Sequence, residues 1–418
     1  MAQKQELIFF TLNDFNKDAG ESVRIYGIVN GLIAAGENVT LISNATDYKM
    51  FKAGINHVNL GFAFKHKKGF QASLGLLPAG IVYSLYKPLF KKIITALEAA
   101  GAIHKEVFFF DYLDNSIGYL LKEKKLIAGY INDIHGIANL EFEANIRNAI
   151  NIKSRIINTA KLFLSKRLDR KVFSNAAGFI FGSNAMDKYF SGLYPIQSAK
   201  RYIIPYVLDD KTTEQKIAPA LKKALEEQYH IQQTDFVILF IGTYKNTSGV
   251  DNLISVFDKL CDLHRHLKLI LVGDGPMKPK CDQLIAAGKW KEKIYTIDRI
   301  AYGDIVTYQS IAHVVVCPDD QNDFSEMIVH VKYFDALLSG KVVLNGSFSS
   351  VTEINVNDSL SVSFTPSSAA SLFEKLHAII ENYSFYQDKY AHTRRYTIAN
   401  LTYEKFITPL ITAEHKNQ

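Results

Sequence analysis

Residues 236–257 read FVILFIGTYKNTSGVDNLISVF. An apolar run is followed by a loop bounded by Gly242 and Gly249, and then by apolar residues at helical spacing. Continuous apolar runs are typical of strands that are buried on both faces of a parallel sheet, with the connecting helices covering those faces. The stretch therefore predicts a strand, loop and helix unit of an α/β fold.

The same unit recurs along the chain in two series. Each apolar run ends in a turn signal and is followed by a longer stretch with helical spacing, which predicts the α/β class with two Rossmann-like, doubly wound parallel-sheet domains. The first series lies at residues 6–12, 38–43, 107–112, 126–133 and 176–183, and the second at 236–243, 267–273, 294–298, 313–318 and 341–347.

Length supports two domains, because 418 residues exceed what one compact core usually holds. The most linker-like segment is polar and charged and spans residues 200–236. We place the first domain at residues 1–205 and the second at 206–384. The helical segment 385–418 is expected to pack back on the first domain.

Composition is that of an ordinary globular protein, with 48% hydrophobic and 22% charged residues. The three cysteines lack the C-x-x-C spacing, so neither a disulfide framework nor a zinc site is implied. The apolar run near the N-terminus is too short for a signal peptide and is interpreted as a strand. These features indicate a reducing cytoplasm.

Two segments raise the question of membrane contact. Residues 151–173 carry seven lysines and arginines against one aspartate, which suits either a solvated helix face or a helix on an anionic membrane or nucleic acid. Residues 72–90 are apolar but are interrupted by Gly75, Pro78, Gly80 and Lys87. That segment is too short to span a bilayer and favours a core helix with a loop, with an interfacial helix as the alternative.

Ligands of open parallel sheets bind beyond the carboxyl ends of the strands, so the residues that follow each apolar run are candidates for binding a ligand. Gly20 opens a helical pattern after the first run and offers bare backbone N–H groups to an anion or a sugar hydroxyl. His135 follows a later run, with Asp133 two residues before it, and is placed to bind a substrate. Each also has a purely structural interpretation, as a turn glycine and a capping histidine.

In the second half, the loop from Gly242 to Gly249 can wrap phosphate oxygens, and Lys245 can supply a countercharge. The loop is not a Walker loop, and G-x-G-x-x-G follows none of the apolar runs, which argues against nucleotide hydrolysis and hydride transfer. Lys332 and Asp335 share one face of a predicted helix that ends at Gly340. On a binding surface, the lysine suits a phosphate and the carboxylate suits the hydroxyls of a ribose.

Taken in order, these motifs resemble the GT-B glycosyltransferases, in particular the large retaining family that uses nucleotide diphosphate sugars. The likeness spans nearly the whole chain and adds two segments to the motifs above, YIIPYVLD at 202–209 and LILVGDGP at 269–276. It implies that two domains face an interdomain cleft that holds the donor. It further implies that no metal or other cofactor takes part.

The resemblance also implies roles for individual residues. His135 would contact the transferred sugar and act as the catalytic residue, while Lys332 would face the diphosphate. Asp335 would take the place of the family glutamate that binds the ribose. Arg299 would line the base pocket, and the loop around Glu326 would meet the donor sugar.

The chain departs from the family pattern at several of these positions. Thr243 and Ser248 stand where the family commonly has an arginine and a lysine in the phosphate loop, so Thr243 and Lys245 are the donor-loop candidates here. Met327 replaces the first of two glutamates that are spaced eight residues apart. Residues 206–207 are Tyr-Val in place of the expected Asn-Gly. A leaving diphosphate needs positive charge, so these changes bear directly on turnover.

The sequence as a whole predicts a cytoplasmic retaining glycosyltransferase that transfers a sugar from a nucleotide diphosphate sugar to a glycan or lipid-linked acceptor. Peripheral contact with the inner face of the membrane remains open, and no nucleic-acid partner is expected. One alternative is a GT-B domain that binds a nucleotide, glycan or partner protein without turnover. Another is a different GT-B chemistry such as sugar-nucleotide epimerisation.

Overall fold

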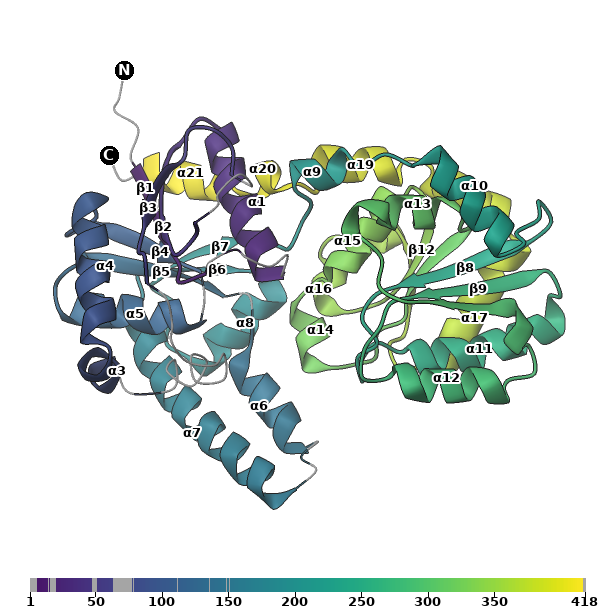
Figure 1. Ribbon diagram of the computed structural model, residues 1–418, viewed down its shortest axis with the longest axis horizontal. Helices are drawn as coiled ribbons and strands as arrows, with labels where there is room; N and C mark the ends of the chain where they lie inside the picture. The colour runs from purple at the N-terminus through teal and green to yellow at the C-terminus, as the bar shows by residue number, and fades with distance from the viewer. Residues whose placement is uncertain are drawn as a thin grey trace. The chain divides into compact units, whose positions relative to one another are not determined.

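The structure is a computed structural model, and it describes residues 6–415 apart from 14, 16–19, 47–50, 63–76, 78, 111, 135, 148 and 150. The chain divides into two compact units. Unit 1 comprises Met1–Pro205 and Tyr403–Gln418, and unit 2 comprises Tyr206–Thr402. Each unit is built around its own parallel sheet (Figure 1).

The described residues of unit 1 form a seven-stranded parallel sheet in the order β3-β2-β1-β4-β5-β6-β7. Successive strands run outward from β1 on one side and from β4 on the other, so the winding reverses between these two strands. The strands are β1 (Glu6–Phe10), β2 (Asn38–Ser43), β3 (Asn56–Asn59), β4 (Glu106–Phe109), β5 (Gly129–Ile134), β6 (Gly178–Phe181) and β7 (Lys200–Ile203).

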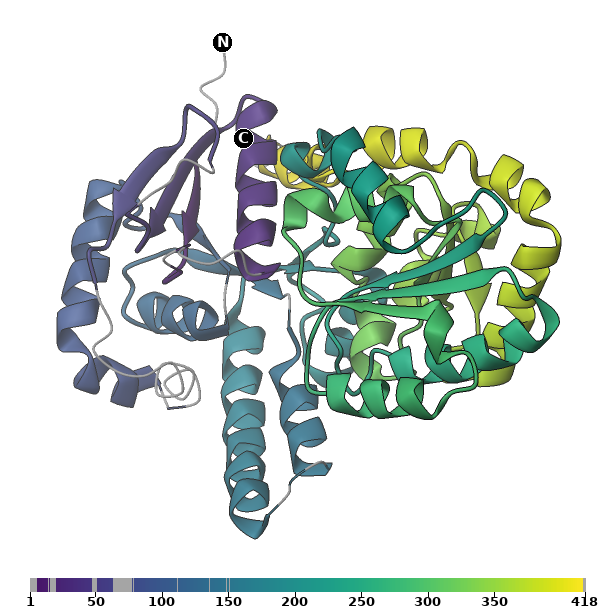
Figure 2. The same ribbon diagram turned by 45° about the vertical axis from the view of Figure 1, so that its right-hand side comes forward.

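Helices flank this sheet, and one pair extends beyond it. Figures 1 and 2 both show α6 and α7 lying side by side and projecting away from the strands of their own unit. The helices of unit 1 are α1 (Gly20–Ala34), α3 (Ala79–Leu85), α4 (Lys87–Ala99), α5 (Tyr112–Glu123), α6 (Ala138–Arg147), α7 (Ile152–Asn175), α8 (Asn184–Leu193), α20 (Tyr403–Phe406) and α21 (Thr408–His415).

Aromatic side chains fill much of the core of unit 1, since Phe9 stacks on both Phe108 and Phe110 at centroid distances of 4.7 and 5.1 Å. The C-terminal segment docks on α1 through a glycine. A Cβ atom at Gly27 would lie 2.0 Å from the ring of Tyr403, so the helix surface must be bare at this point. This close approach holds the returning segment in unit 1.

The apolar segment at 72–90 becomes two helices within its described part. Tyr86 separates α3 from α4, and a proline follows within the first turn of α4. Ile81 and Leu85 of α3 are exposed, whereas one face of α4 is buried. The first part of the segment lies outside the described residues.

The described residues of unit 2 form a six-stranded parallel sheet in the order β10-β9-β8-β11-β12-β13. The winding reverses between β8 and β11, which pair directly with each other. The strands are β8 (Phe236–Ile241), β9 (Leu267–Val272), β10 (Ile294–Ile297), β11 (Val314–Cys317), β12 (Val342–Gly346) and β13 (Val362–Phe364). The predicted α/β class with two doubly wound parallel sheets is confirmed.

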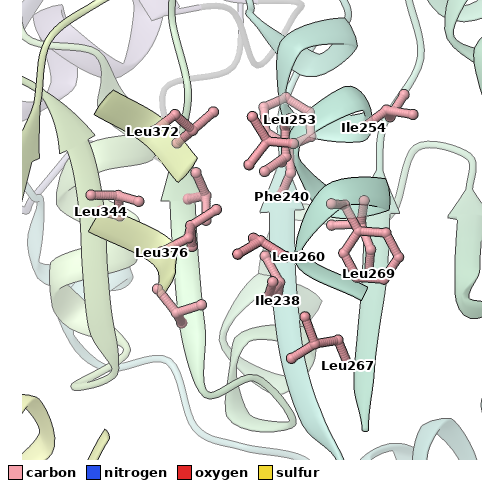
Figure 3. Close-up of a cluster of buried hydrophobic side chains, with 14 of the residues drawn as sticks. Ile238, Phe240, Leu253, Ile254, Leu260, Leu267, Leu269, Leu344, Leu372 and Leu376 are labelled. Carbon is pink, nitrogen blue, oxygen red and sulfur yellow. The ribbon is translucent and has the colours of Figure 1, made fainter. Parts of the chain in front are cut away.

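Two helices of unit 2, α11 and α17, cover one face of the sheet and interlock with its side chains (Figure 3). Figure 1 shows α10, α13, α15 and α19 on the other face. The helices of unit 2 are α9 (Asp210–Thr213), α10 (Pro219–Gln228), α11 (Val250–Leu263), α12 (Lys278–Ala287), α13 (Ile305–Ser310), α14 (Asp323–Met327), α15 (Val331–Leu338), α16 (Ser349–Thr352), α17 (Ala369–Glu381), α18 (Tyr383–Tyr390) and α19 (Thr393–Asn400). Short 3₁₀ turns are η1 (Lys291–Lys293), η2 (Tyr302–Asp304) and η3 (Val356–Asp358).

The C-terminal helices divide differently from the expected segment 385–418. Residues 385–402 belong to unit 2, and only the chain from Tyr403 onward belongs to unit 1. The reason is packing, because Tyr390 is buried in the hydrophobic core of unit 2 and the guanidinium of Arg394 donates to the carbonyl oxygen of Leu338. These contacts hold α18 and α19 on the second sheet.

Candidate functional site

The carboxyl edge of the unit 2 sheet has the topology of a binding site. Because β8 and β11 are neighbours whose connections leave in opposite directions, their loops diverge at this edge. Open α/β sheets bind ligands at such reversal points. The loops after β8, β9 and β11 therefore define the candidate site.

Backbone hydrogen bonds fasten these three loops together. The N–H of Tyr244, in the loop after β8, donates to the carbonyl oxygen of Asp274 in the loop after β9, at 3.1 Å. The N–H of Asp320, after β11, donates to the carbonyl oxygen of Thr247 at 3.0 Å. The three loops thus form one continuous surface at the edge of the sheet.

Gly249 ends the β8 loop and permits this close packing. Its φ is +61°, in the left-handed region, and a Cβ atom built there would lie 1.9 Å from the carbonyl oxygen of Pro318. A side chain would push the β8 and β11 loops apart. The residue directly precedes α11, so the backbone N–H groups that open this helix lie beside the β11 loop.

The predicted donor residues of the β8 loop have different environments. Thr243 and Lys245 are both exposed. Ser248 is buried, and its hydroxyl donates to the carbonyl oxygen of Lys245 at 2.7 Å. This serine therefore shapes the loop from inside, and Lys245 is the cation that the loop presents.

Lys332 lies in the first turn of α15 and reaches the β11 loop. Its Nζ is 2.7 Å from the carboxylate of Asp319, whose side chain is only 7% exposed, against 20% for the lysine. The same Nζ lies 5.4 Å from the centre of the Phe240 ring. The predicted phosphate contact is thus held in a half-buried ion pair at the carboxyl edge of β8 and β11.

Asp335 is buried one turn further along α15 and pairs with a different partner. Tyr302 donates its hydroxyl proton to Oδ1 of Asp335 at 2.9 Å. Burial raises the pKa of Asp335 to about 7, and the negative charge of Asp209 adds to this rise while the hydrogen bond from Tyr302 opposes it. The tyrosine hydroxyl also lies 3.4 Å from Oγ1 of Thr212, which donates to Asp209 at 2.6 Å.

Sequence reasoning did not identify this network of Asp209, Thr212, Tyr302 and Asp335. Tyr302 lies 33 residues before Asp335, in a turn that carries no recognisable motif. Without the fold, nothing in the sequence pairs the two side chains.

Glu326 and Arg299 differ in their contacts with the rest of the protein. The carboxylate of Glu326 accepts from the side-chain amide of Gln321 at 2.7 Å and from the backbone N–H of Ser349 at 2.8 Å. Burial raises the pKa of Glu326, but these hydrogen bonds outweigh that effect and the net pKa is lowered. Arg299 lies after β10 and is exposed. Glu326 is therefore fixed within its loop, whereas Arg299 extends into solvent.

Sequence reasoning missed a buried histidine beside α15. His330 directly precedes α15, and its Nε2 is 3.0 Å from the hydroxyl of Ser325. Burial lowers its pKa to about 4; the carboxylate of Asp319 opposes this shift, and the ammonium groups of Lys332 and Lys245 reinforce it. Both lysines therefore act on the same imidazole, which is neutral at pH 7.

In unit 1, the residues beside the predicted sugar contact form a closed ion pair. His135 itself lies outside the described residues, and Gly20 is the first residue of α1. Asp133, at the end of β5, accepts two hydrogen bonds from the guanidinium of Arg24 on α1, at 2.6 and 2.7 Å. Arg24 also donates to the carbonyl oxygen of Ile204 at 2.7 Å. Sequence reasoning noted Asp133 but missed Arg24.

One cluster among the described residues has the composition of a metal site. Ligand atoms of His264, His377 and Glu381 lie within 4.8 Å of one another. Nε2 of His264 is 2.9 Å from Nδ1 of His377 and 3.5 Å from the carboxylate of Glu381. The groups thus pair with one another, and His264 lies just before β9, at the opposite edge of the sheet from the loops above.

Comparison with protein families gives one match in unit 2. Residues 222–398 match the model of the family described as Glycosyl transferases group 1. The Alpha-monoglucosyldiacylglycerol synthase of Acholeplasma laidlawii is 26% identical over 110 residues, which cover 26% of this chain and 26% of the synthase. The match thus spans about a quarter of the length of that curated relative.

Solved structures match over almost the whole chain. Sucrose-phosphate synthase from Thermosynechococcus elongatus has a TM-score of 0.70 and 13% identity, covering 99% of both chains. HepE of Anabaena, solved in complex with UDP, has a TM-score of 0.68 and 13% identity, covering 99% of this chain and 100% of that one. At such identities the likeness establishes the fold, and the predicted GT-B architecture of two Rossmann-like domains is confirmed.

Proposed function

We propose that this chain, whose residues 222–398 match the model of the group 1 glycosyl transferases, transfers a sugar from a nucleotide diphosphate sugar to a glycan or lipid-linked acceptor. In this reaction the bond between the anomeric carbon and the diphosphate breaks, the oxygen of the acceptor hydroxyl forms the new bond, and the hydroxyl proton passes to the leaving diphosphate. Negative charge develops on the leaving diphosphate. The protein must therefore place fixed positive charge beside those oxygens.

The observation that carries the proposal is the pair of lysines at the edge of the unit 2 sheet. Lys245 is exposed on the β8 loop, and Lys332 is half-buried beside β8 and β11. A Cβ atom built at Gly242, which opens the β8 loop, would lie 3.5 Å from Cδ of Lys332, so the stem of Lys332 runs along the start of the loop that carries Lys245. Two ammonium groups and the backbone N–H groups at the start of α11 suit a diphosphate.

Bound diphosphate would draw Lys332 from Asp319 to a phosphate oxygen. The ion pair holds the ammonium at 2.7 Å from the carboxylate, so the lysine is already ordered before the donor binds. A short rotation of its flexible side chain is enough to change partners. The ion pair thus keeps the ammonium of Lys332 in position for a phosphate before the donor binds.

The remaining roles follow from the resemblance and are part of the same proposal. Asp335 would accept the hydroxyls of the ribose, and Arg299 would line the base pocket. Glu326 and its loop would meet the donor sugar, while His135 would contact that sugar from the first domain. Transfer would need no metal ion and would retain the anomeric configuration, with the acceptor attacking from the face that the diphosphate leaves. The protein would act in the cytoplasm.

A second candidate function is nucleotide binding without turnover. It is favoured by one specific observation, since Ser248 is turned into the loop where the family places a lysine, and Thr243 replaces an arginine. Loss of one well-placed donor to a developing charge typically costs about 100-fold to 1000-fold in rate. A protein of this kind would bind UDP or another nucleoside diphosphate tightly and transfer nothing.

One set of measurements tests both candidates. Thermal shift with UDP, GDP, ADP and the corresponding sugars identifies a ligand, because a bound nucleotide stabilises the folded state by mass action. Donor consumption is then followed with and without acceptor, and product analysis separates transfer from hydrolysis and epimerisation. Binding with transfer supports the first candidate, and binding without turnover supports the second. If no nucleotide or nucleotide sugar binds, both are wrong.

The Lys332→Ala variant tests the site itself. Removing a charge-assisted hydrogen bond to phosphate should weaken UDP binding by about 10-fold to 100-fold. Lys389→Ala serves as the matched control, since Lys389 is exposed on α18, far along the chain from the site loops. Equal affinities of wild type, Lys332→Ala and the control would remove Lys332 from the donor site.

A further inference from the structure

The first half of α7 exposes large apolar side chains that a soluble surface rarely presents together. Ile152, Ile156 and Phe163 are 79%, 63% and 65% exposed. Their spacing of four and seven residues places them on one face of the helix. The three side chains form an apolar stripe along one exposed face of α7, with Thr159 between Ile156 and Phe163.

The second half of α7 anchors the helix to its own unit. Leu168, Val172 and Phe173 are buried. Asn139 of α6 donates to the carboxylate of Asp169 at 2.9 Å, and the hydroxyl of Ser165 donates back to Asn139 at 2.5 Å. The exposed stripe therefore lies on a fixed helix rather than on a loose segment, and α6 supports it from one side (Figure 2).

Basic side chains border the apolar stripe on both sides. At 100° per residue, Arg155 and Lys166 fall on one flank of the stripe, and Lys153 and Lys171 fall on the other. Lys166 is paired with Glu143 of α6 at 2.8 Å, which leaves Arg155 as the cation of its flank. Within α7 itself the seven lysines and arginines stand against one acidic residue, Asp169, which is buried. The N-terminal end of the helix dipole, which has no acidic residue in its first turn, adds positive potential.

We infer that α7 binds the surface of an anionic lipid bilayer, with Ile152, Ile156 and Phe163 in the acyl boundary and the flanking cations at the headgroups. An apolar stripe with basic borders is the pattern of helices that lie in a membrane interface. Each lysine or arginine near an anionic surface adds about a fivefold gain in affinity. In the described ranges, none of the helices has the length and hydropathy needed to cross a bilayer, so contact would be peripheral.

The combination of apolar and basic side chains on α7 favours an anionic bilayer over a second copy of the chain or a nucleic acid. A second copy of the chain, placed face to face on the same stripe, would bring the basic borders of both copies together, which is unfavourable. A nucleic acid would meet the cations but would leave the three apolar side chains in water. An anionic bilayer offers an apolar region to the three apolar side chains and negative headgroups to the basic side chains. The inference does not depend on the proposed sugar transfer.

Vesicle co-sedimentation of the full chain tests the inference. The protein should sediment with vesicles of phosphatidylglycerol and phosphatidylcholine, should stay in solution with pure phosphatidylcholine, and should bind less as salt is raised. Ile156→Ser/Phe163→Ser should weaken binding about 100-fold, and Lys153→Gln/Arg155→Gln about 30-fold. These side chains are exposed, so the thermal midpoint and any UDP-induced shift should not change.

Matched controls lie in unit 2. Leu263→Ser removes an equally exposed apolar side chain, and Lys259→Gln/Lys375→Gln neutralises two exposed lysines. Both controls should bind vesicles as the wild type does. The inference is wrong if wild type ignores anionic vesicles or if the α7 variants bind like the controls. It is also wrong if sedimentation velocity shows a dimer that the α7 variants abolish, because the stripe would then be an interface between copies.

Discussion

Each unit of the protein places an ion pair near the carboxyl edge of its sheet, but the two pairs differ in how completely they are enclosed. In unit 1, Arg24 and Asp133 have side-chain exposures of 0% and 1% and share two hydrogen bonds. In unit 2, Nζ of Lys332 lies 2.7 Å from both carboxylate oxygens of Asp319, and the lysine side chain is 20% exposed. The first pair is closed to ligands and the second is accessible.

This difference in exposure indicates a structural role for the first ion pair and a ligand-binding role for the second. The guanidinium of Arg24 also donates to the carbonyl oxygen of Ile204, so it ties α1, β5 and the chain after β7 together. A compact ammonium on a flexible stem, as in Lys332, can exchange partners at low cost. We therefore interpret the arginine pair as part of the core of unit 1 and the lysine pair as part of a donor site.

The Arg24→Met variant should have the largest effect on stability. It keeps the volume of the side chain but leaves Asp133 buried without a cation, which typically costs about 3–5 kcal/mol. Urea unfolding followed by far-UV circular dichroism should show an early transition of unit 1.

Lys332→Met is the matched variant in unit 2. Water reaches this pair, so the variant should lower the free energy of unfolding by only about 1–2 kcal/mol. Equal losses for the two variants would contradict the distinction between a closed and an accessible pair.

Asp335 extends the comparison, because this buried carboxylate accepts a hydrogen bond from the hydroxyl of Tyr302 instead of pairing with a cation. Folding raises its pKa to about 7. Between about pH 4 and pH 7 the folded state keeps a proton that the unfolded state has lost, so this group makes stability fall as pH rises through that window. Asp335→Asn should therefore gain stability relative to wild type as pH rises, by about 2–4 kcal/mol at pH 8 and by almost nothing at pH 4.

The measurement is the difference in thermal midpoint between Asp335→Asn and wild type at each pH. Taking the difference removes the opposite contributions of His313 and His330, whose pKa values burial lowers to about 4 in both proteins. A difference that is constant with pH would show that Asp335 is ionised at low pH and that its burial is offset by water or by an unrecognised partner.

Much of the fold could be predicted from the sequence because apolar runs such as FVILFI and LKLILV allow few alternatives to buried parallel strands. The short edge strands β3 and β13 were missed. β3, for example, has the sequence NHVN, and its exposed and half-buried residues carry no apolar signal. The extent of the returning C-terminal segment depended on which sheet buries Tyr390, and a helical pattern cannot specify that.

The site was less predictable, for a physical reason. The ends of the predicted strands drew attention to the β8 loop and to α15, since the topology of a parallel sheet collects those residues at one edge. The partners of Lys332 and Asp335 could not be found this way. Asp319 and Tyr302 lie 13 and 33 residues away in loops, and only the packing of α15 against the sheet brings them within hydrogen-bond distance.

Asp319→Asn gives the smallest and most informative effect on the accessible pair. If Lys332 must leave Asp319 to reach a phosphate, removing the competing charge should strengthen UDP binding, by about fivefold for roughly 1 kcal/mol. The double variant Lys332→Ala/Asp319→Asn should bind UDP no better than Lys332→Ala, because the gain acts through the lysine. Isothermal titration of the four proteins completes the cycle. Weaker binding by Asp319→Asn alone would mean that the carboxylate stays paired with Lys332 and orients its ammonium while the nucleotide is bound, so that the second pair keeps its partner as the first pair does.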